Sequence, residues 1–211
     1  MTRRGLGDTM IFWECPTSET VAGFLQGQSG QEWSYPGIGK TRTRAAARGY
    51  VTDHHRVRLG EGDAAFEAAC EAIRCWAMFD VGWASVVPEP DPPGEGQTVA
   101  ILFEILGCWW LNACRVVYLI DEDGPPRRFG FAYGTLPDHV ERGEERFLVE
   151  QDSDGVTWYD LSAFSRPRHL LAKIGYPVAR MMQRRFARGS LAAMKRAVHQ
   201  SLELSVSQKE P

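Results

Sequence analysis

Residues 127–164 read RRFGFAYGTLPDHVERGEERFLVEQDSDGVTWYDLSAF, and this stretch decides the fold. Within it, apolar and polar side chains alternate in three strand-like runs, Arg127–Leu136, Glu145–Gln151 and Val156–Phe164. The turn at Asp152-Ser-Asp-Gly155 contains the Asp-Gly pair whose positive φ angles suit a short hairpin. Connections this short cannot hold the crossover that parallel strands need, so we expect an antiparallel meander.

The same alternation extends toward the N-terminus. Thr98–Leu106 and Trp109–Ile120 are two further strand-like runs, and the turn 121–126 joins the second to the stretch above. Residues 88–96 carry four prolines, which cannot donate to a strand ladder, so we expect an exposed connector there. Val51–Leu59 is polar and is predicted to be an edge strand.

Two helices are predicted before the meander. The first spans Thr17–Gln28, with Thr17 or Ser18 as its cap. The second starts at the cap residue Asp63, and its apolar stripe continues through Phe79.

The C-terminal part, 167–204, is also predicted to be helical. Gly175-Tyr176-Pro177 should kink or restart this helix, because proline deletes a helical hydrogen bond. Residues 205–211 are expected to be disordered. The element order predicts an α+β fold in which a curved antiparallel sheet grips a long C-terminal helix, as one domain over residues 1–211.

Composition narrows the class of protein. The 211 residues are 44% hydrophobic and 24% charged, with a formal net charge of −3, which argues against a nucleic-acid binder. No apolar run approaches the roughly 20 residues of a membrane span, and no apolar segment follows the basic start as in a secretory signal. We therefore expect a cytoplasmic protein. Five cysteines without a C-x-x-C pair indicate reduced thiols, and we expect no metal and no cofactor.

Several motif-like segments do not meet the requirements of known sites. Ser34–Thr41 nearly spells a phosphate-binding loop, but Ser34 replaces the first glycine and no apolar strand precedes it, so we interpret it as a glycine-bearing turn. His54-His55 and His139–Glu145 lack the spacing of a coordination sphere. No G-x-S-x-G elbow is present, so covalent catalysis has no sequence support.

Arg115 lies on an apolar strand, in the same alternation as Leu111 and Ala113. If that face is internal, the guanidinium needs a partner, because an unpaired buried charge is too costly. The partner is either a carboxylate, with Glu104, Glu144 and Glu145 as candidates, or an anionic ligand; the remaining alternative is that Arg115 is simply exposed.

Strand Arg127–Leu136 has rings on one face and Gly130, Ala132 and Gly134 on the other. Small residues leave room on a curved sheet. We expect that room to be filled by the C-terminal helix or by an apolar ligand.

Nine basic residues between Arg166 and Arg196 have no acidic neighbour in sequence before Glu203. Arg180, Arg184 and Arg188 stack at a spacing of four, where like charges repel. The acid-rich stretch 141–154 is a candidate internal partner, while anionic lipid headgroups or an acidic protein are external candidates.

Six groups of residues form a family-like signature: Trp109-Trp110-x-Asn112-x-Cys114-Arg115-Val116-Val117-Tyr118, Gly130-Phe-Ala-Tyr-Gly-Thr-Leu-Pro137, His139, Gly143-Glu-Glu145, Trp158-Tyr159 and Phe164-Ser-Arg-Pro167. With them the chain resembles the domain of unknown function 1990 family, from about Trp33 to Val198. The element order is similar to the helix-grip fold of the START and polyketide cyclase-like superfamily. That resemblance implies an enclosed apolar ligand and no defined activity.

The leading hypothesis is a protein that binds a lipid-like or polycyclic molecule between sheet and helix, with little or no catalysis. The candidate ligand-binding residues are Trp110, Arg115, Tyr118, Tyr133 and Tyr159, with Arg115 holding an anionic head and the rings supplying apolar area.

Two other classes remain open. A cyclase-like enzyme would use the same pocket, with His139 and Glu145 as proton-transfer groups. An interaction module would place Arg180, Arg184 and Arg188 on an anionic membrane or an acidic partner.

Overall fold

The computed structural model describes residues 10–43, 45, 48–168 and 176–207, and within these ranges eight strands form one antiparallel sheet. Their spatial order is β2-β8-β7-β6-β5-β4-β3, with β1 paired to β5. The strands are β1 Met10–Phe12, β2 Val51–Glu61, β3 Ala84–Val87, β4 Thr98–Ile105, β5 Cys108–Glu122, β6 Arg127–Thr135, β7 Glu141–Gln151 and β8 Val156–Pro167.

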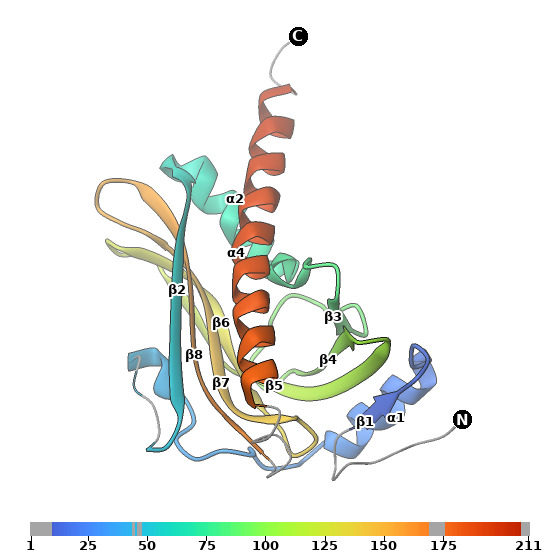
Figure 1. Cartoon of the computed structure of the whole chain (residues 1–211). Coiled ribbons are helices and arrows are strands. Elements are labelled where there is room, and N and C mark those ends of the chain that lie inside the picture. The colour runs from blue at the N-terminus through green and yellow to red at the C-terminus, as the bar shows by residue number, and fades with distance from the viewer. Residues whose placement is uncertain (1–9, 44, 46–47, 169–175, 208–211) are drawn as a thin grey trace.

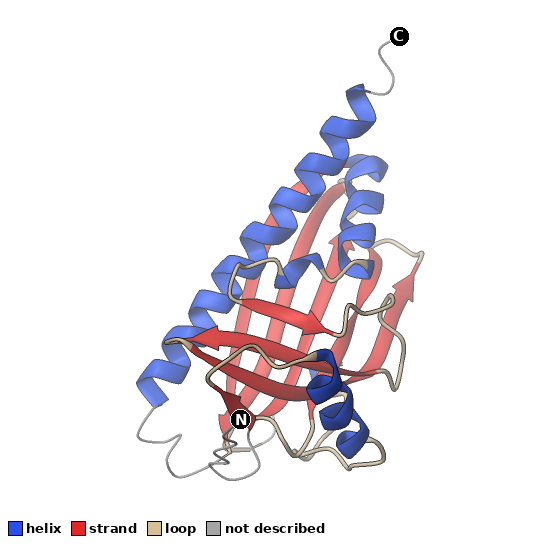
Figure 2. Cartoon of the chain, turned by 90° about the vertical axis from the view of Figure 1, so that its right-hand side faces the viewer, coloured by secondary structure: helices blue, strands red, loops and turns tan. Residues whose placement is uncertain are grey.

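The described helices are α1 (Ser18–Gln28), α2 (Gly62–Arg74) and α4 (Tyr176–Ser207), with 3-10 turns η1 (Lys40–Thr43) and η2 (Ala77–Phe79). The sheet curves around α4, and α2 lies beside α4 on the same side of the sheet (Figures 1 and 2). The predicted α+β helix-grip architecture is therefore confirmed, and β2 is an edge strand as expected. Strands β1 and β3 were not predicted.

Alternation along β4 separates two apolar cores. Ile101 belongs to the core beneath α2 and α4, whereas Ala100 and Leu102 pack with Phe24 of α1. We call the side of α2 and α4 the inner face and the side of α1 the outer face. Because both faces are covered, an apolar strand position in this half of the sheet can belong to either one.

The inner face carries a cluster of aromatic rings. Phe79 of η2 lies 5.8 Å from Phe147 and 5.3 Å from Phe186, and Phe131 lies 5.2 Å from Phe147, measured between ring centroids. All four side chains are buried. Burying a ring of this size stabilises the fold by about 1.5–3 kcal/mol, so the cluster fixes α4 on the sheet.

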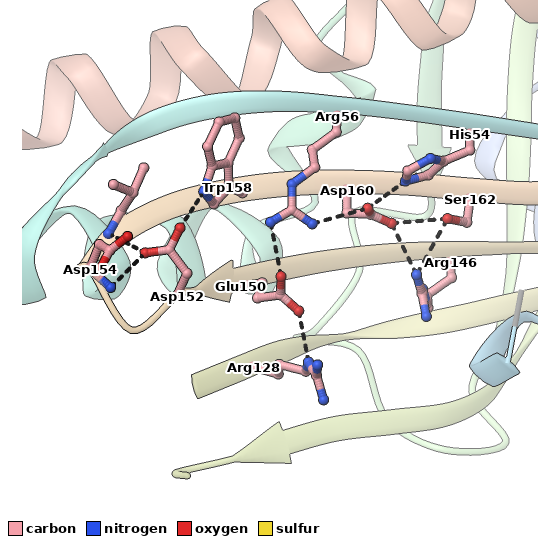
Figure 3. Close-up of polar contacts among 11 residues, drawn as sticks. His54, Arg56, Arg128, Arg146, Glu150, Asp152, Asp154, Trp158, Asp160 and Ser162 are labelled. Atoms are coloured by element: carbon pink, nitrogen blue, oxygen red, sulfur yellow. Dashed lines mark hydrogen bonds and ion pairs between the residues drawn. The ribbon is translucent and has the colours of Figure 1, made fainter. Parts of the chain in front are cut away.

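The outer face of β2, β8, β7 and β6 carries a network of polar and charged side chains (Figure 3). Glu150 accepts hydrogen bonds from Arg56 at 2.9 Å and from Arg128 at 2.8 Å, which links three strands. The fully buried Asp160 is paired with Arg146 at 3.0 Å and with His54 at 2.6 Å. His54, one of the motif-like histidines, is thus part of a structural network.

The predicted N-terminal cap is confirmed for α1 and is wrong for α2. Thr17 caps α1 by accepting a hydrogen bond from the amide of Thr20, as expected. Asp63 does not cap α2, because the helix already begins at Gly62, and its carboxylate pairs with Arg127 at 3.0 Å. The apolar stripe also leaves the α-helix early, since Trp76 has a left-handed φ of 53° and Phe79 lies in η2.

The C-terminal region differs from the prediction at its start. β8 continues to Pro167, and α4 begins at Tyr176, in agreement with a restart at 175–177. Residues 169–175, which the predicted helix included, and 208–211 of the expected tail lie outside the described residues. Ser205–Ser207 belong to α4 instead of the expected tail. None of the described helices combines the length and hydropathy needed to cross a membrane.

Candidate functional site

A cavity of about 910 Å³ lies between the inner face of the sheet and the first turns of α4. Helix α4 contributes the small residues Ala179 and Ala187 to its wall, together with larger side chains. Much of the lining is apolar and comes from strands and helix together, as in Phe103, Tyr133, Leu161, Ala179, Met182 and Phe186. Space of this size and lining is typical of small-molecule sites.

An ionisable pair stands at the cavity wall. Tyr133 of β6 lies directly opposite Glu145 of β7, and its hydroxyl donates a hydrogen bond of 2.7 Å to Glu145 Oε2. The pKa of the Glu145 carboxyl is raised to about 7, chiefly because burial removes its hydration. The hydrogen bond from Tyr133 opposes this rise in pKa, and the charges of Glu141 and Asp53 add to it. The same burial holds the pKa of Tyr133 well above its usual value. Glu145 therefore changes charge near neutral pH.

Helix α4 closes the cavity with polar contacts to the sheet. Gln183 donates from Nε2 to Glu141 Oε1 at 2.5 Å and to Ser165 Oγ at 3.0 Å. Arg180 binds both carboxylate oxygens of Asp53, at 2.5 and 2.7 Å. The hydrogen bond from Arg180 lowers the pKa of Asp53, whereas burial raises the pKa of Glu141.

His139 also lines the cavity, after the end of β6. Its Nδ1 accepts the amide hydrogen of Glu141 at 3.0 Å, so this nitrogen is unprotonated. Burial lowers the pKa of His139 to about 4, which leaves the ring neutral at pH 7. In the described part of the chain, His139 and Glu145 share the cavity but are not hydrogen bonded to each other.

A family model for a "Domain of unknown function (DUF1990)" matches residues 34–193. The chain belongs to the DUF1990 family. Three similar proteins carry the name UPF0548 protein. The one from Dictyostelium discoideum is 33% identical over 208 residues, covering 90% of this chain and 96% of that protein. The one from Deinococcus radiodurans is 40% identical over 201 residues, covering 89% and 98%, and At2g17695 from Arabidopsis thaliana is 35% identical over 157 residues, covering 72% and 76%.

Solved structures similar to this DUF1990 chain include Ara h 8.0201, with a TM-score of 0.45 and 14% identity over 72% of this chain and 99% of that one. The Zhui aromatase/cyclase from Streptomyces has a TM-score of 0.45 and 16% identity, covering 74% and 96%. A norcoclaurine synthase mutant from Thalictrum has a TM-score of 0.45 and 16% identity, covering 75% and 99%. Structural similarity at this level says nothing about the chemistry of this DUF1990 chain.

Four of the residues singled out from sequence line the cavity of the DUF1990 chain: Trp110, Tyr133, His139 and Glu145. Tyr159 does not line it. Its ring is fully buried and its hydroxyl is hydrogen bonded to Ser190 Oγ of α4 at 2.9 Å. Tyr159 therefore fixes the helix to β8 beside the cavity.

Arg115 lies on the outer face, which corrects the prediction of an inward arginine. Its guanidinium donates to the carbonyls of Gln28 and Gln31, both at 2.9 Å, and to Thr98 Oγ1 at 3.1 Å. Arg115 therefore ties the end of α1 and the loop that follows it to β5. Its partners are thus neither a carboxylate, as one alternative proposed, nor a cavity ligand.

Tyr118 is also on the outer face, where its hydroxyl is 2.7 Å from Thr41 Oγ1. The room beside Gly134 is taken by Tyr35, because an added Cβ at this glycine would lie 2.1 Å from the Tyr35 hydroxyl oxygen. The small-residue face of β6 is thus turned away from α4 and from the cavity. The expectation that the helix or a ligand fills that room is wrong.

The segment Ser34–Thr41 of the DUF1990 chain is a turn, as interpreted from the sequence. It binds a carboxylate of the same chain, that of Glu144. Glu144 accepts hydrogen bonds from the amide of Gly39 at 2.7 Å, from the amide of Thr41 at 2.9 Å and from the Tyr35 hydroxyl at 2.8 Å. Backbone amides that converge in this way bind anions. Sequence reasoning did not identify Glu144 as their ligand.

The basic residues of α4 have separate surroundings. Arg180 is paired with Asp53, which lies outside the acid-rich stretch expected as the partner. Arg184 lines the cavity and is exposed, Arg188 is exposed, and Arg185 lies over the ring of Trp83 at 4.9 Å. Within the described ranges, no group of three or more His, Cys, Asp or Glu side chains is arranged to hold a metal.

Proposed function

We propose that this DUF1990 protein binds an apolar or lipid-like small molecule in the cavity between the inner face and α4. The observation that carries the proposal is the cavity itself, about 910 Å³ of space beside a largely aromatic and aliphatic wall. Such walls gain from contact with an apolar body, because its transfer from water is favourable. Polar groups at the wall, among them Glu145 and Tyr133, would orient the ligand.

A cavity-filling variant tests this proposal with the neutral dye Nile red as the probe. Ala179→Trp places a large ring in the cavity, and we expect it to weaken Nile red binding by about tenfold or more. Ala192→Trp is the matched control, because Ala192 is exposed on the same helix, and it should bind the dye like the wild type. Equal dye affinity in all three proteins, or no dye binding by the wild type, contradicts the proposal.

A second candidate function is acid/base catalysis on a ligand in the same cavity. The specific observation in its favour is that Glu145 changes charge near pH 7 and is hydrogen bonded to Tyr133 at the cavity wall. A general base works best when its pKa lies near the working pH. In this reading Glu145 moves the proton, and His139, neutral at pH 7, accepts or donates a hydrogen bond.

Solvent exchange of an acidic C–H tests the catalytic candidate. Small cyclic ketones incubated with the protein in D₂O should gain deuterium faster than in buffer, and Glu145→Gln should remove the gain. Glu150→Gln is the control, since Glu150 lies on the outer face of the same strand. An exchange rate that does not change in Glu145→Gln excludes Glu145 as the base.

A further inference from the structure

The charges around the cavity are not balanced at Glu145. Two other carboxyl groups, those of Glu141 and Asp53, line the same cavity, and both raise the pKa of Glu145. On strand β7, Glu141 and Glu145 lie on the same face because they are four residues apart. Like charges held together in a poorly hydrated space repel each other, so Glu145 is better matched by a cationic donor than by a neutral or an anionic one.

The cations nearby are engaged elsewhere or lie at the surface. Arg180 donates two hydrogen bonds to Asp53, and Arg184 lines the cavity at its exposed edge on α4. Glu141 accepts a hydrogen bond from the neutral amide of Gln183, and the positive charge of Arg180 also acts on it.

Glu145 also has hydrogen-bonding capacity to spare. Its Oε2 accepts from Tyr133, while Oε1 has no hydrogen-bond partner among the described residues. The side chain lines the cavity, so a ligand can reach this oxygen. A carboxylate accepts several hydrogen bonds, and an ammonium group donates up to three.

We propose, building on the function proposed above, that the cavity selects an apolar molecule carrying a basic amine, with its ammonium group donating to Glu145 and Glu141 adding attraction. Alcohols would satisfy the free oxygen without offsetting the negative charge, and carboxylates would add to the repulsion. The amine therefore has an advantage over its isosteres. The apolar wall contributes equally to all three.

A matched set of head groups tests this selectivity. 1-Naphthylmethylamine, 1-naphthylmethanol and 1-naphthoate share one ring system and differ in charge, and each can compete with Nile red. At pH 8 we expect the amine to bind about tenfold more tightly than the alcohol, and the carboxylate to bind most weakly. Below pH 7 the advantage of the amine should shrink, because Glu145 takes up a proton.

The other charged or titratable groups at or beside the cavity are Tyr133, Glu141, Asp53, His55, His139, Arg180 and Arg184. To isolate Glu145 from them, Glu145→Gln should bind the amine and the alcohol alike while still binding Nile red. Glu150→Gln removes the same charge from the outer face of β7 and should keep the preference for the amine.

Three outcomes separate the two proposals. A preference for the amine that disappears only in Glu145→Gln supports the inference. Equal displacement of bound Nile red by all three compounds, or displacement by none of them, overturns the amine preference and leaves the cavity function standing. Failure of the wild type to bind Nile red overturns the cavity function and the inference with it.

Discussion

Tyr133 donates a 2.7 Å hydrogen bond to Glu145 across the β6–β7 pair, and this contact places an ionisable carboxyl group on the wall of the cavity. The pair lies on the inner face because Tyr133 is opposite Val116, whose side chain belongs to the core beneath α4. The chemistry of the cavity is therefore set by register in the sheet and by burial.

Tyr133→Phe should raise the pKa of Glu145 above its value of about 7. The hydroxyl donates to the charged carboxylate, and removing a donor disfavours the charged form. A ¹³C NMR titration of the Glu145 carboxyl carbon measures the midpoint directly. A midpoint that stays in place or falls would show that Tyr133 does not stabilise the ionised form.

The stability of the fold should depend on pH through Glu145. Its folded pKa is raised above the unfolded value, so between about pH 4.5 and 7 the folded state holds a proton that the unfolded chain has lost, and stability falls as pH rises. Relative to Glu145→Gln, the wild type should lose on the order of 3 kcal/mol across this window. Urea unfolding at several pH values measures the difference.

The comparison with Glu145→Gln matters because His139 acts in the opposite direction. Its folded pKa is lowered to about 4, so it adds stability as pH rises toward its ordinary value. Both proteins contain His139, so its contribution cancels when the free energy of unfolding of Glu145→Gln is subtracted from that of the wild type at each pH. A wild type and variant with parallel pH profiles would mean that Glu145 is not desolvated in the folded protein.

Arg115→Met should destabilise the protein by about 2–3 kcal/mol and leave Nile red affinity unchanged. The variant loses three hydrogen bonds and leaves the carbonyls of Gln28 and Gln31 without this donor. Arg58→Met is the control, since Arg58 is exposed and its pair with Glu61 is a surface contact. Weaker Nile red binding by folded Arg115→Met would contradict this prediction and indicate that Arg115 contributes to the ligand site.

Gly134→Ala should cost about 1–3 kcal/mol, because its Cβ collides with the ring of Tyr35 on the outer face. Gly23→Ala is the matched control: Gly23 lies in α1 with open space around it, and alanine is the better helix former there, so stability should rise slightly. Thermal unfolding followed by circular dichroism measures both. A Gly134→Ala protein as stable as the wild type would contradict the packing of Tyr35 on β6.

Sequence reasoning predicted the meander because the period of two and the turn residues act locally. Assigning the faces required information that is not local. Arg115 and Tyr118 are three residues apart on β5, so regular alternation would place their side chains on opposite faces of the sheet. They nevertheless pair with Gly134 and Ala132, which share one face of β6. An irregularity between Val116 and Tyr118 shifts the register, and no residue type in that stretch indicates it.

The sequence likewise identified part of the candidate site and missed the rest. The rings and carboxyl groups of β6 and β7 were identified because their residue types suit a cavity, and Tyr133 and Glu145 do meet there. Arg115 was misplaced because α1 and Tyr35 cover the outer face, so its apolar neighbours on the strand did not mark the inner side. Asp53 and Gln183 were missed because their partners are distant in sequence.

The most direct test of the account is native mass spectrometry of the protein purified without denaturation from its own cells, beside the Ala179→Trp and Ala192→Trp variants. The account predicts an additional bound mass on the wild type and on Ala192→Trp, and the bare polypeptide mass for Ala179→Trp. Bare polypeptide in all three spectra, or the same bound mass in all three, would contradict a ligand held between the sheet and α4.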